Sequence, residues 1–184
     1  VVPATPLDEA FDVSLAEEAM VAMGFRPKRI TPPAQRFGYF SGTDQQRADE
    51  LNAMFADRDV KAIFALRGGW GCQRILPLLD WPIIRANPKL LIGFSDITAL
   101  HLAILAKANF VTLHGPNANS AWGKRSLENF RQVAVDGATP TYRNPVADED
   151  RLIQRKWRTQ TLRGGKAQGR LIGGNLAVLT AMVG

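Results

Sequence analysis

The sequence predicts an α/β fold built on a doubly wound, mostly parallel sheet. Two observations predict it. Short apolar runs alternate with helical patterns over the first 135 residues, and two of these runs, 60–66 and 90–94, each lead through a turn into a helix. Strands that alternate with helices favour a parallel sheet covered by helices on both faces, as in flavodoxin-like and Rossmann-like domains.

The amino-terminal elements follow in order. A strand is expected to end near Val1–Val2, and a helix to run over about 8–23 with Gly24 as its C-cap. A second strand is expected over 25–30, followed by a proline-rich loop. The stretch 43–46 has the spacing of a capping box, which predicts the start of another helix.

The central elements are strand, turn and helix units. The expected strand 60–66 ends in the glycine-rich turn 67–71, and the expected strand 90–94 continues into a helix with apolar residues at helical spacing. A further strand over 110–113 ends in the motif His114-Gly115-Pro116.

The composition is that of a globular chain. Hydrophobic residues make up 46% of the 184 residues, which is ample for a core and excludes a disordered chain. No apolar run approaches the ~20 residues of a membrane span, and no signal peptide is visible. The single cysteine, Cys72, excludes an internal disulfide and a cysteine-rich metal site. Beside the glycine-rich turn it can be a catalytic thiol, but a small buried hydrophobic role is favoured.

The net charge of +6 comes entirely from the carboxyl-terminal segment. Residues 1–150 carry 16 Lys and Arg against 17 Asp and Glu, whereas residues 151–184 carry 7 basic residues and no acidic ones. A nucleic-acid-binding domain more often spreads basic residues over a folded face with aromatic residues among them, and Trp157 is the only aromatic residue of this segment. We therefore predict no nucleic-acid partner and interpret the segment as a linker or an incomplete second domain.

Ser95 stands at the corner between the expected strand 90–94 and the helix that follows. A hydroxyl there is exposed at the carboxyl end of the strand, and the backbone N–H groups of the next turn point at the oxygen of the group that it attacks. This is the arrangement of a nucleophile elbow. The alternative is that Ser95 caps the helix, which is the more frequent arrangement for a serine when this segment is taken alone.

The turn Arg67-Gly68-Gly69-Trp70-Gly71 shifts the balance toward the elbow. Glycines let the backbone approach a ligand closely, and turns at the carboxyl ends of neighbouring strands face one crevice in an open α/β sheet. Ser95 can then supply the nucleophile and Gly69 a backbone N–H for the oxyanion. The turn can also cradle a phosphate or simply connect strand and helix, but it matches neither of the common nucleotide-binding glycine patterns.

A serine nucleophile needs a base, usually a histidine oriented by a carboxylate. His114 ends a strand on the same rim as Ser95, where it can line the site or bond a loop as a structural residue. His101 lies six residues into the helix after Ser95 and is expected to point away from the crevice. Asp96 can stabilise its own helix through the macrodipole. No convincing triad is found within residues 1–184.

The strand and helix rhythm stops near Gly137, which divides the chain. We predict a nucleophile-bearing α/β domain over 1–136, a connector over 137–160, and the beginning of an incomplete carboxyl-terminal domain over 161–184. The apolar run 176–183 has nothing after it to pack on, as expected for a truncated domain.

Several motifs in this order closely resemble the LD-carboxypeptidase family, the serine peptidases of the S66 type, which include the microcin C immunity peptidase. These motifs are Arg67-Gly68-Gly69-Trp70-Gly71, Asn87-Pro88-Lys89, Gly93-Phe94-Ser95-Asp96-Ile97-Thr98 and His114-Gly115-Pro116. The stretch 36–51 and the later Gly173-Gly174-Asn175-Leu176 fit as well, so the resemblance covers essentially the whole chain.

The resemblance implies a cytoplasmic enzyme, often dimeric, that releases the terminal D-alanine from murein tetrapeptide by cutting an L–D peptide bond during cell-wall recycling. It implies Ser95 as the nucleophile and the backbone N–H groups of Gly69 and Asp96 as the oxyanion hole, with no metal and no cofactor. Four further residues are expected to contact the substrate: Arg67, Gly68, Trp70 and His114.

The resemblance also places the Glu and His of the triad in a carboxyl-terminal domain beyond Leu176. After Leu176 this sequence contains no Glu and no His, so both triad residues are missing from it. Removing the base of a triad costs several powers of ten in rate. We therefore expect this chain to be nearly inactive by itself and the missing domain to be its partner.

Two alternatives stay open. In the first, the substrate is a peptidyl-nucleotide, and an aromatic side chain such as Trp122 stacks on its base. In the second, the chain is a flavodoxin-like binding or regulatory module in which Ser95 only caps a helix. Hydrolysis assays with both substrate types, and labelling of Ser95 by a serine-directed reagent, separate these hypotheses.

Overall fold

A computed structural model describes residues 1–7, 10–30, 36–142 and 152–183, without the side chains of residues 10–12. The chain divides into two compact units, Val1–Ser126 with Ile172–Gly184, and Leu127–Leu171. The first unit holds the sheet and every residue expected in the site. The second contains the end of α6 (Lys124–Phe130) and the π-helical turn Arg131–Val135, whereas residues 152–171 form neither helix nor strand.

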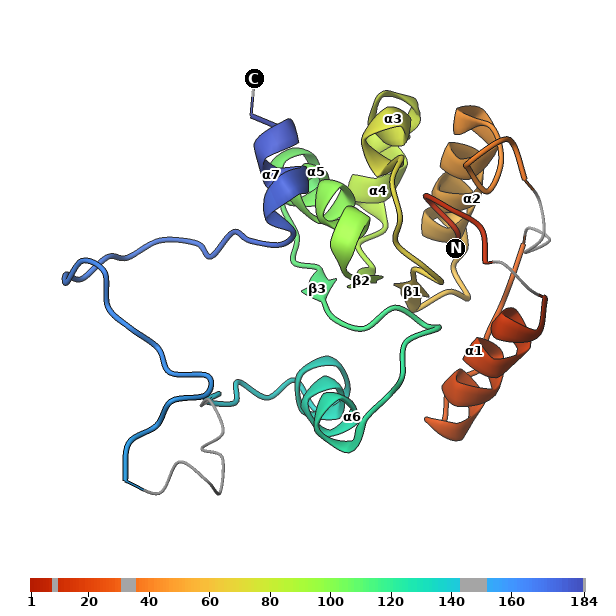
Figure 1. Cartoon of the computed structure of the whole chain (residues 1–184). Helices are drawn as coiled ribbons and strands as arrows, with labels where there is room; N and C mark the ends of the chain where they lie inside the picture. The colour runs from red at the N-terminus through yellow and green to blue at the C-terminus, as the bar shows by residue number, and fades with distance from the viewer. Residues whose placement is uncertain (8–9, 31–35, 143–151, 184) are drawn as a thin grey trace. The chain divides into compact units, whose positions relative to one another are not determined.

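Three parallel strands form the sheet of the first unit, in the order β1 (Ala62–Phe64), β2 (Leu90–Gly93) and β3 (Leu113–His114) (Figure 1). Ile63 pairs with Leu91 in one ladder, and Gly93 pairs with His114 in the other. Each connection between neighbouring strands is a helical crossover, as parallel pairing requires. The predicted parallel α/β fold is confirmed.

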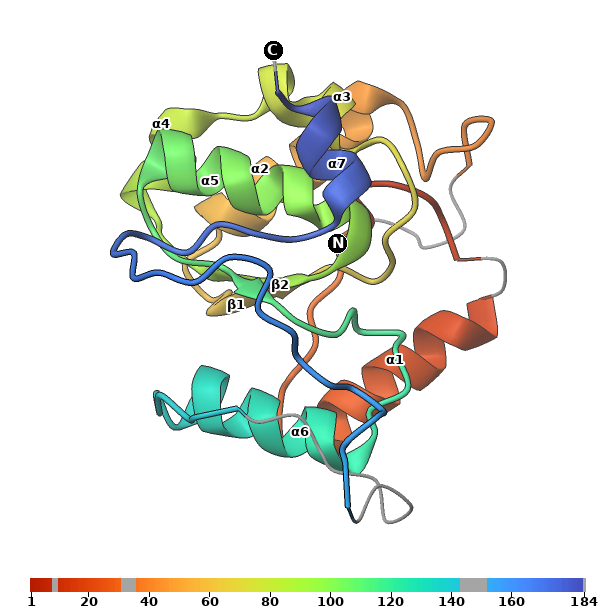
Figure 2. The same cartoon turned by 60° about the vertical axis from the view of Figure 1, so that its left-hand side comes forward.

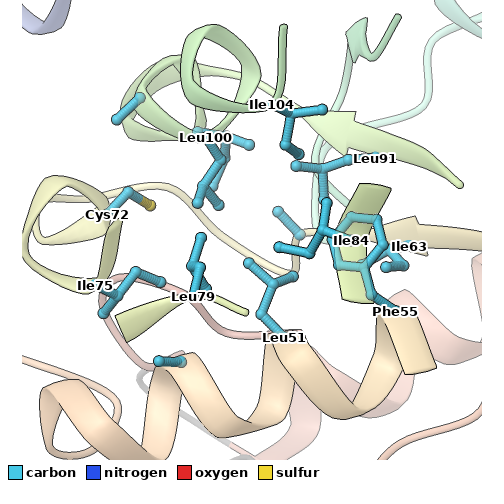
Figure 3. Packing of buried hydrophobic residues seen from close by; sticks show 14 of the residues in the cluster. Leu51, Phe55, Ile63, Cys72, Ile75, Leu79, Ile84, Leu91, Leu100 and Ile104 are labelled. Carbon is cyan, nitrogen blue, oxygen red and sulfur yellow. The ribbon is translucent and has the colours of Figure 1, made fainter. Parts of the chain in front are cut away.

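One face of the sheet carries the larger core. It is covered by α2 (Asp44–Ala56), α3 (Cys72–Ile75), α4 (Trp81–Ala86) and α5 (Thr98–Ala108), as Figures 1 and 2 show. Figure 3 shows the cluster from close by, with Leu51 and Phe55 of α2 directed toward Ile63 and Leu91 of the sheet. Leu100 of α5 completes this layer and is fully buried.

The other face packs against α1 (Ala10–Ala22). Val13, Ala16 and Met20 of this helix form a second cluster with two residues of the sheet side. These are Phe64, the last residue of β1, and Leu66, two residues beyond it. Ile63 and Phe64 thus belong to opposite clusters, because successive side chains of a strand point to opposite faces. The sheet is therefore covered on both faces, as a doubly wound fold requires.

The structure differs from the prediction at three of the strands. Of the expected strand 110–113, only Leu113 lies in β3, which continues to His114. Residues 25–30 are not a strand: Pro27 cannot donate to a ladder, and the ring of Phe25 packs at 5.9 Å from that of Phe64. The amino terminus of Val1 donates to Phe64 O (2.9 Å), and Val1 O accepts from Leu66 N (2.8 Å). These two bonds involve a single residue, so residues 1–2 are not a strand.

The predicted helix ends are confirmed where the structure describes them. Gly24 has φ +91° and follows α1, as a C-cap glycine does, whereas the expected start of this helix at residues 8–9 lies outside the described residues. Thr43 and Gln46 form the capping box of α2. Lys89 donates to the carbonyls of Met54 (2.7 Å) and Asp57, which gives the Asn87-Pro88-Lys89 motif a structural role at the end of α2.

Within the described ranges, none of the helices combines the length and the apolar character that crossing a bilayer requires. A cavity of about 390 Å³ lies along β1 and α1, and its lining includes Val60, Phe64 and Met20 but none of the residues expected in the site.

Candidate active site

Ser95 occupies a strained corner between β2 and α5. Phe94 is extended (φ −142°, ψ −176°), Ser95 has φ +65°, and the chain then forms a 3-10 turn over Ser95–Ile97 before α5 begins. A positive φ costs a residue with a Cβ atom roughly 1–2 kcal/mol, and such strain concentrates at functional sites. The N-cap positions are Phe94 for the turn and Ile97 for α5, and neither end has a side-chain cap bond. Ser95 is therefore not the cap of either helix.

The glycine-rich turn lies against this corner. A Cβ atom built on Gly68 would lie 3.1 Å from Ser95 Cβ and 3.4 Å from Ser95 Oγ. Gly69, with φ +121°, has no space for a side chain, because its Cβ would overlap Thr5. The structure thus brings together the two turns that the sequence predicts at one rim of the sheet.

Three side chains fix the glycine-rich turn. Thr5 Oγ1 donates to Gly68 O (2.8 Å), Arg47 Nη1 donates to Gly71 O (3.0 Å), and Arg67 Nη1 donates to Pro6 O (3.0 Å). Arg67 therefore helps to hold the turn through a backbone carbonyl. Within the turn, Trp70 remains half exposed, with its ring 5.8 Å from that of Phe40.

Hydrogen bonds also hold both ends of the Gly93–Phe94 peptide, just before Ser95. Gly93 O accepts from Gly115 N (3.1 Å) and bonds His101 Nε2 (2.9 Å), and Phe94 N donates to Asn117 Oδ1 (3.1 Å). Since a carbonyl only accepts, Nε2 must carry the proton in this His101 tautomer. The motif His114-Gly115-Pro116 and the residue after it, Asn117, thereby hold the backbone on the strand side of Ser95.

Neither histidine is placed as a base for Ser95: in the described residues, no hydrogen bond joins Ser95 to His101 or His114. His114 is exposed at the end of β3, and its ring lies 6.0 Å from that of His101. His101, expected to point away from the crevice, is buried and bonds the carbonyl of Gly93 at the end of β2. A helix position alone did not reveal this, because the side chain reaches back to the preceding strand.

His101 makes stability depend on pH. Burial, and to a smaller extent the nearby His114, lower the pKa of His101, against the opposing effect of the Gly93 bond. The unfolded chain therefore binds this proton more readily than the folded chain. The stability that neutral His101 contributes is complete above about pH 6.5, the ordinary histidine pKa. It is lost as the pH falls toward the lower pKa that His101 has in the folded chain.

We expect the free energy of unfolding to fall more steeply between pH 7.5 and 5 in the wild type than in His101→Gln, whose amide can still donate to Gly93. Urea denaturation at several pH values measures both slopes. His114→Gln, at an exposed position, serves as the control and should keep most of the wild-type slope. Equal slopes in the wild type and His101→Gln would contradict the prediction.

Cys72 is a buried hydrophobic residue, as favoured from the sequence. Its side chain is fully buried, and burial, followed by the neighbouring Asp96 carboxylate, raises the pKa of its thiol well above the ordinary value. A thiol that resists ionisation is a poor nucleophile.

Asp96 follows Ser95 and is almost fully buried. Its carboxylate Oδ2 accepts from Cys72 N (2.8 Å), at the end of the glycine-rich turn. Within the described residues, no group of three or more His, Cys, Asp or Glu is arranged to hold a metal ion.

The Gly173-Gly174-Asn175-Leu176 motif lies against the start of α5. A Cβ atom on Gly174 would lie 2.5 Å from Thr98 Cγ2, and Asn175 N donates to Thr98 Oγ1 (2.9 Å). Asn175 also caps α7 (Leu176–Ala181), which packs on α5 (Figure 1). Residues 172–184 belong to the same compact unit as Ser95, and the existence of a further domain stays a prediction.

Comparison with known proteins places these motifs in a family. Residues 1–115 match the LD-carboxypeptidase N-terminal domain. A probable murein peptide carboxypeptidase of Bacillus subtilis is 33% identical over 190 residues, which cover 100% of this chain and 56% of the relative. The murein tetrapeptide carboxypeptidase of Pseudomonas aeruginosa is 37% identical over 155 residues, which cover 81% of this chain and 48% of the relative. The chain therefore spans about half the length of these curated relatives.

Solved structures agree on the fold. The microcin C7 self-immunity protein MccF in its wild-type apo state superposes with a TM-score of 0.78 at 27% identity, covering 100% of this chain and 61% of MccF.

Proposed function

The chain belongs to the LD-carboxypeptidase family of serine peptidases, and from this premise we propose that the complete protein releases the terminal D-alanine of murein tetrapeptide. The observation that carries the proposal is Ser95 itself. It is held at φ +65°, caps neither helix, and lies against the glycine-rich turn at Gly68. A strained serine with no capping role, beside a glycine-rich turn whose backbone can approach a ligand closely, is suited to nucleophilic attack on a carbonyl.

In the proposed reaction, Ser95 Oγ attacks the carbonyl carbon of the L–D peptide bond. The oxygen of the tetrahedral intermediate accepts hydrogen bonds from the N–H groups of Gly69 and Asp96. The C–N bond then breaks, D-alanine leaves as the protonated amine, and water releases the acyl group from Ser95. The base that takes and returns the proton, and its carboxylate partner, would come from the part of the protein that follows Leu176.

Four residues around Ser95 would contact the peptide. Gly68 leaves the hydroxyl uncovered, because any side chain there would lie against Ser95. Trp70 and His114 are exposed enough to meet a ligand. Arg67 would pair with the substrate carboxylate while its bond to Pro6 holds the turn, since a guanidinium carries five N–H donors. We propose further, from the family resemblance, that the enzyme is cytoplasmic, can form a homodimer and needs no metal or cofactor.

A peptidyl-nucleotide is the second candidate substrate, because structures of MccF, which this chain resembles, hold adenosine monophosphate and aspartyl sulfamoyl adenosine. Trp122, the aromatic residue considered for stacking on a base, instead packs in the cluster around α1 and donates from Nε1 to Ala118 O (3.3 Å). This placement gives the nucleotide alternative no support within the described residues.

The test is hydrolysis of both substrates by the complete protein. We expect release of D-alanine from murein tetrapeptide, unchanged by a metal chelator, and a much lower rate with a peptidyl-nucleotide. Residues 1–184 alone should be slower by about 10⁴-fold or more, as for a triad without its base. Cleavage of the peptidyl-nucleotide without D-alanine release would reject the murein substrate.

A further inference from the structure

The carboxylate of Asp96 is a buried charge between the two turns of the site. Only 2% of the residue is exposed, and its Oδ2 accepts from the backbone N–H of Cys72 at 2.8 Å. A buried carboxylate is costly unless it is hydrogen-bonded, and bonds from a backbone N–H to a charged oxygen are among the stronger ones. This contact joins residues 24 positions apart in the chain.

The contact fixes one end of a single peptide group. Gly71, which precedes Cys72, is the N-cap of α3 and provides no side chain, so the Asp96 carboxylate takes the place of a local cap. The carbonyl of the same peptide, Gly71 O, accepts from Arg47 Nη1 at 3.0 Å. Arg47 is itself only 2% exposed and also donates to Pro3 O (2.6 Å). A buried anion and a buried cation thus hold the two ends of the Gly71–Cys72 peptide.

This peptide lies two residues from Gly69, and Asp96 lies next to Ser95. We propose that the Asp96 carboxylate is a positioning residue that ties the elbow to the glycine-rich turn and sets where the Gly69 N–H lies relative to Ser95 Oγ. This role belongs to the side chain and is separate from that of the Asp96 backbone N–H. It rests on the proposed function, in which Gly69 stabilises the oxyanion.

The test compares Asp96→Ala and Asp96→Asn in the complete protein. A misplaced oxyanion donor affects the transition state more than substrate binding, and displacement by about 1 Å costs on the order of 10²-fold. We expect Asp96→Ala to lower kcat by about 10²-fold with KM changed less than about threefold. Asp96→Asn retains an acceptor oxygen and should recover most of this loss.

Asp80→Ala is the matched control. Asp80 Oδ1 accepts from Ile83 N at 2.9 Å at the start of α4, so it also satisfies the beginning of a short helix, but it touches neither turn of the site. It should lower the melting temperature without lowering kcat. A kcat for Asp96→Ala within twofold of the wild type, or an equal fall of kcat in Asp80→Ala, would overturn the proposal.

If Asp96→Ala does not fold, Asp96→Val, which fills the space but offers no acceptor oxygen, takes its place, with hydrogen exchange at the Cys72 amide as a second measurement. Faster exchange together with a lower kcat supports the positioning role, and faster exchange at wild-type kcat refutes it.

Labelling of Ser95 by an organophosphonate separates this proposal from the function on which it rests. If Ser95 of the wild-type protein is labelled but no D-alanine is released, the murein substrate is rejected. The role of Asp96 is still tested in that case, because the rate of labelling should fall in Asp96→Ala. A wild-type protein that is never labelled rejects the serine mechanism itself.

Discussion

Replacing Ser95 by alanine in the complete protein is expected to lower D-alanine release by about 10⁴- to 10⁶-fold, the range found when a triad serine is removed. The loss should appear in kcat, because the hydroxyl forms a bond only during the reaction. No capping bond is lost with it, since Ser95 caps neither the 3-10 turn nor α5. Steady-state kinetics on murein tetrapeptide measure the effect, and turnover near the wild-type rate would refute Ser95 as the nucleophile.

A glycine at the same position tests the strain of the elbow. Alanine keeps the penalty of φ +65°, whereas glycine adopts this region freely. The free energy of unfolding of Ser95→Gly should therefore be about 1 kcal/mol higher than that of Ser95→Ala. Both variants should be equally inactive. Ser14→Ala, at an exposed position of α1, serves as the control and should keep both activity and stability.

The elements best predicted from the sequence are those with local signals. The apolar runs 60–66 and 90–94 contain β1 and β2, and the Thr43 capping box begins α2 as predicted. The corner between strand and helix at Ser95 was located by the same kind of signal, because the strand, the serine and the helical pattern are adjacent. The expected strand over 25–30 failed for a local reason as well: its proline outweighs its flanking apolar residues.

The side chains that hold the site could not be predicted in this way. Arg47 reaches Gly71, and Asn117 reaches Phe94, across 24 and 23 residues of sequence. In a helix pattern, Arg47 is one more charged residue on α2, and nothing in its spacing indicates that it is buried. Asn117 had the better signal, since it directly follows the His114-Gly115-Pro116 motif. Such contacts depend on how the helices pack on the sheet, which a pattern of single elements does not specify.

The second large effect is expected at Gly69. A Cβ atom there would overlap Thr5 Oγ1 and lie 2.6 Å from Thr5 Cγ2, and φ is +121°. Thr5 cannot simply rotate away without cost, because its hydroxyl donates to Gly68 O at 2.8 Å. Gly69→Ala is therefore expected to lower the free energy of unfolding by about 3 kcal/mol, from overpacking and positive φ together. It should also lower kcat by about 10²- to 10³-fold, because the displaced N–H is the proposed oxyanion donor.

Two companion variants separate the crowding from the backbone strain. Gly24→Ala introduces a side chain at φ +91° with no atom within 4 Å, so it should lose only about 1 kcal/mol of stability and keep full activity. Thr5→Ala combined with Gly69→Ala removes the two closest atoms and leaves Thr5 Cβ, the third closest, at 2.9 Å from the new side chain. Part of both the stability and kcat should then return, because the turn can move back toward Ser95. Thermal unfolding and D-alanine release measure the coupling, and purely additive losses would mean that crowding by Thr5 does not set the position of the Gly69 N–H.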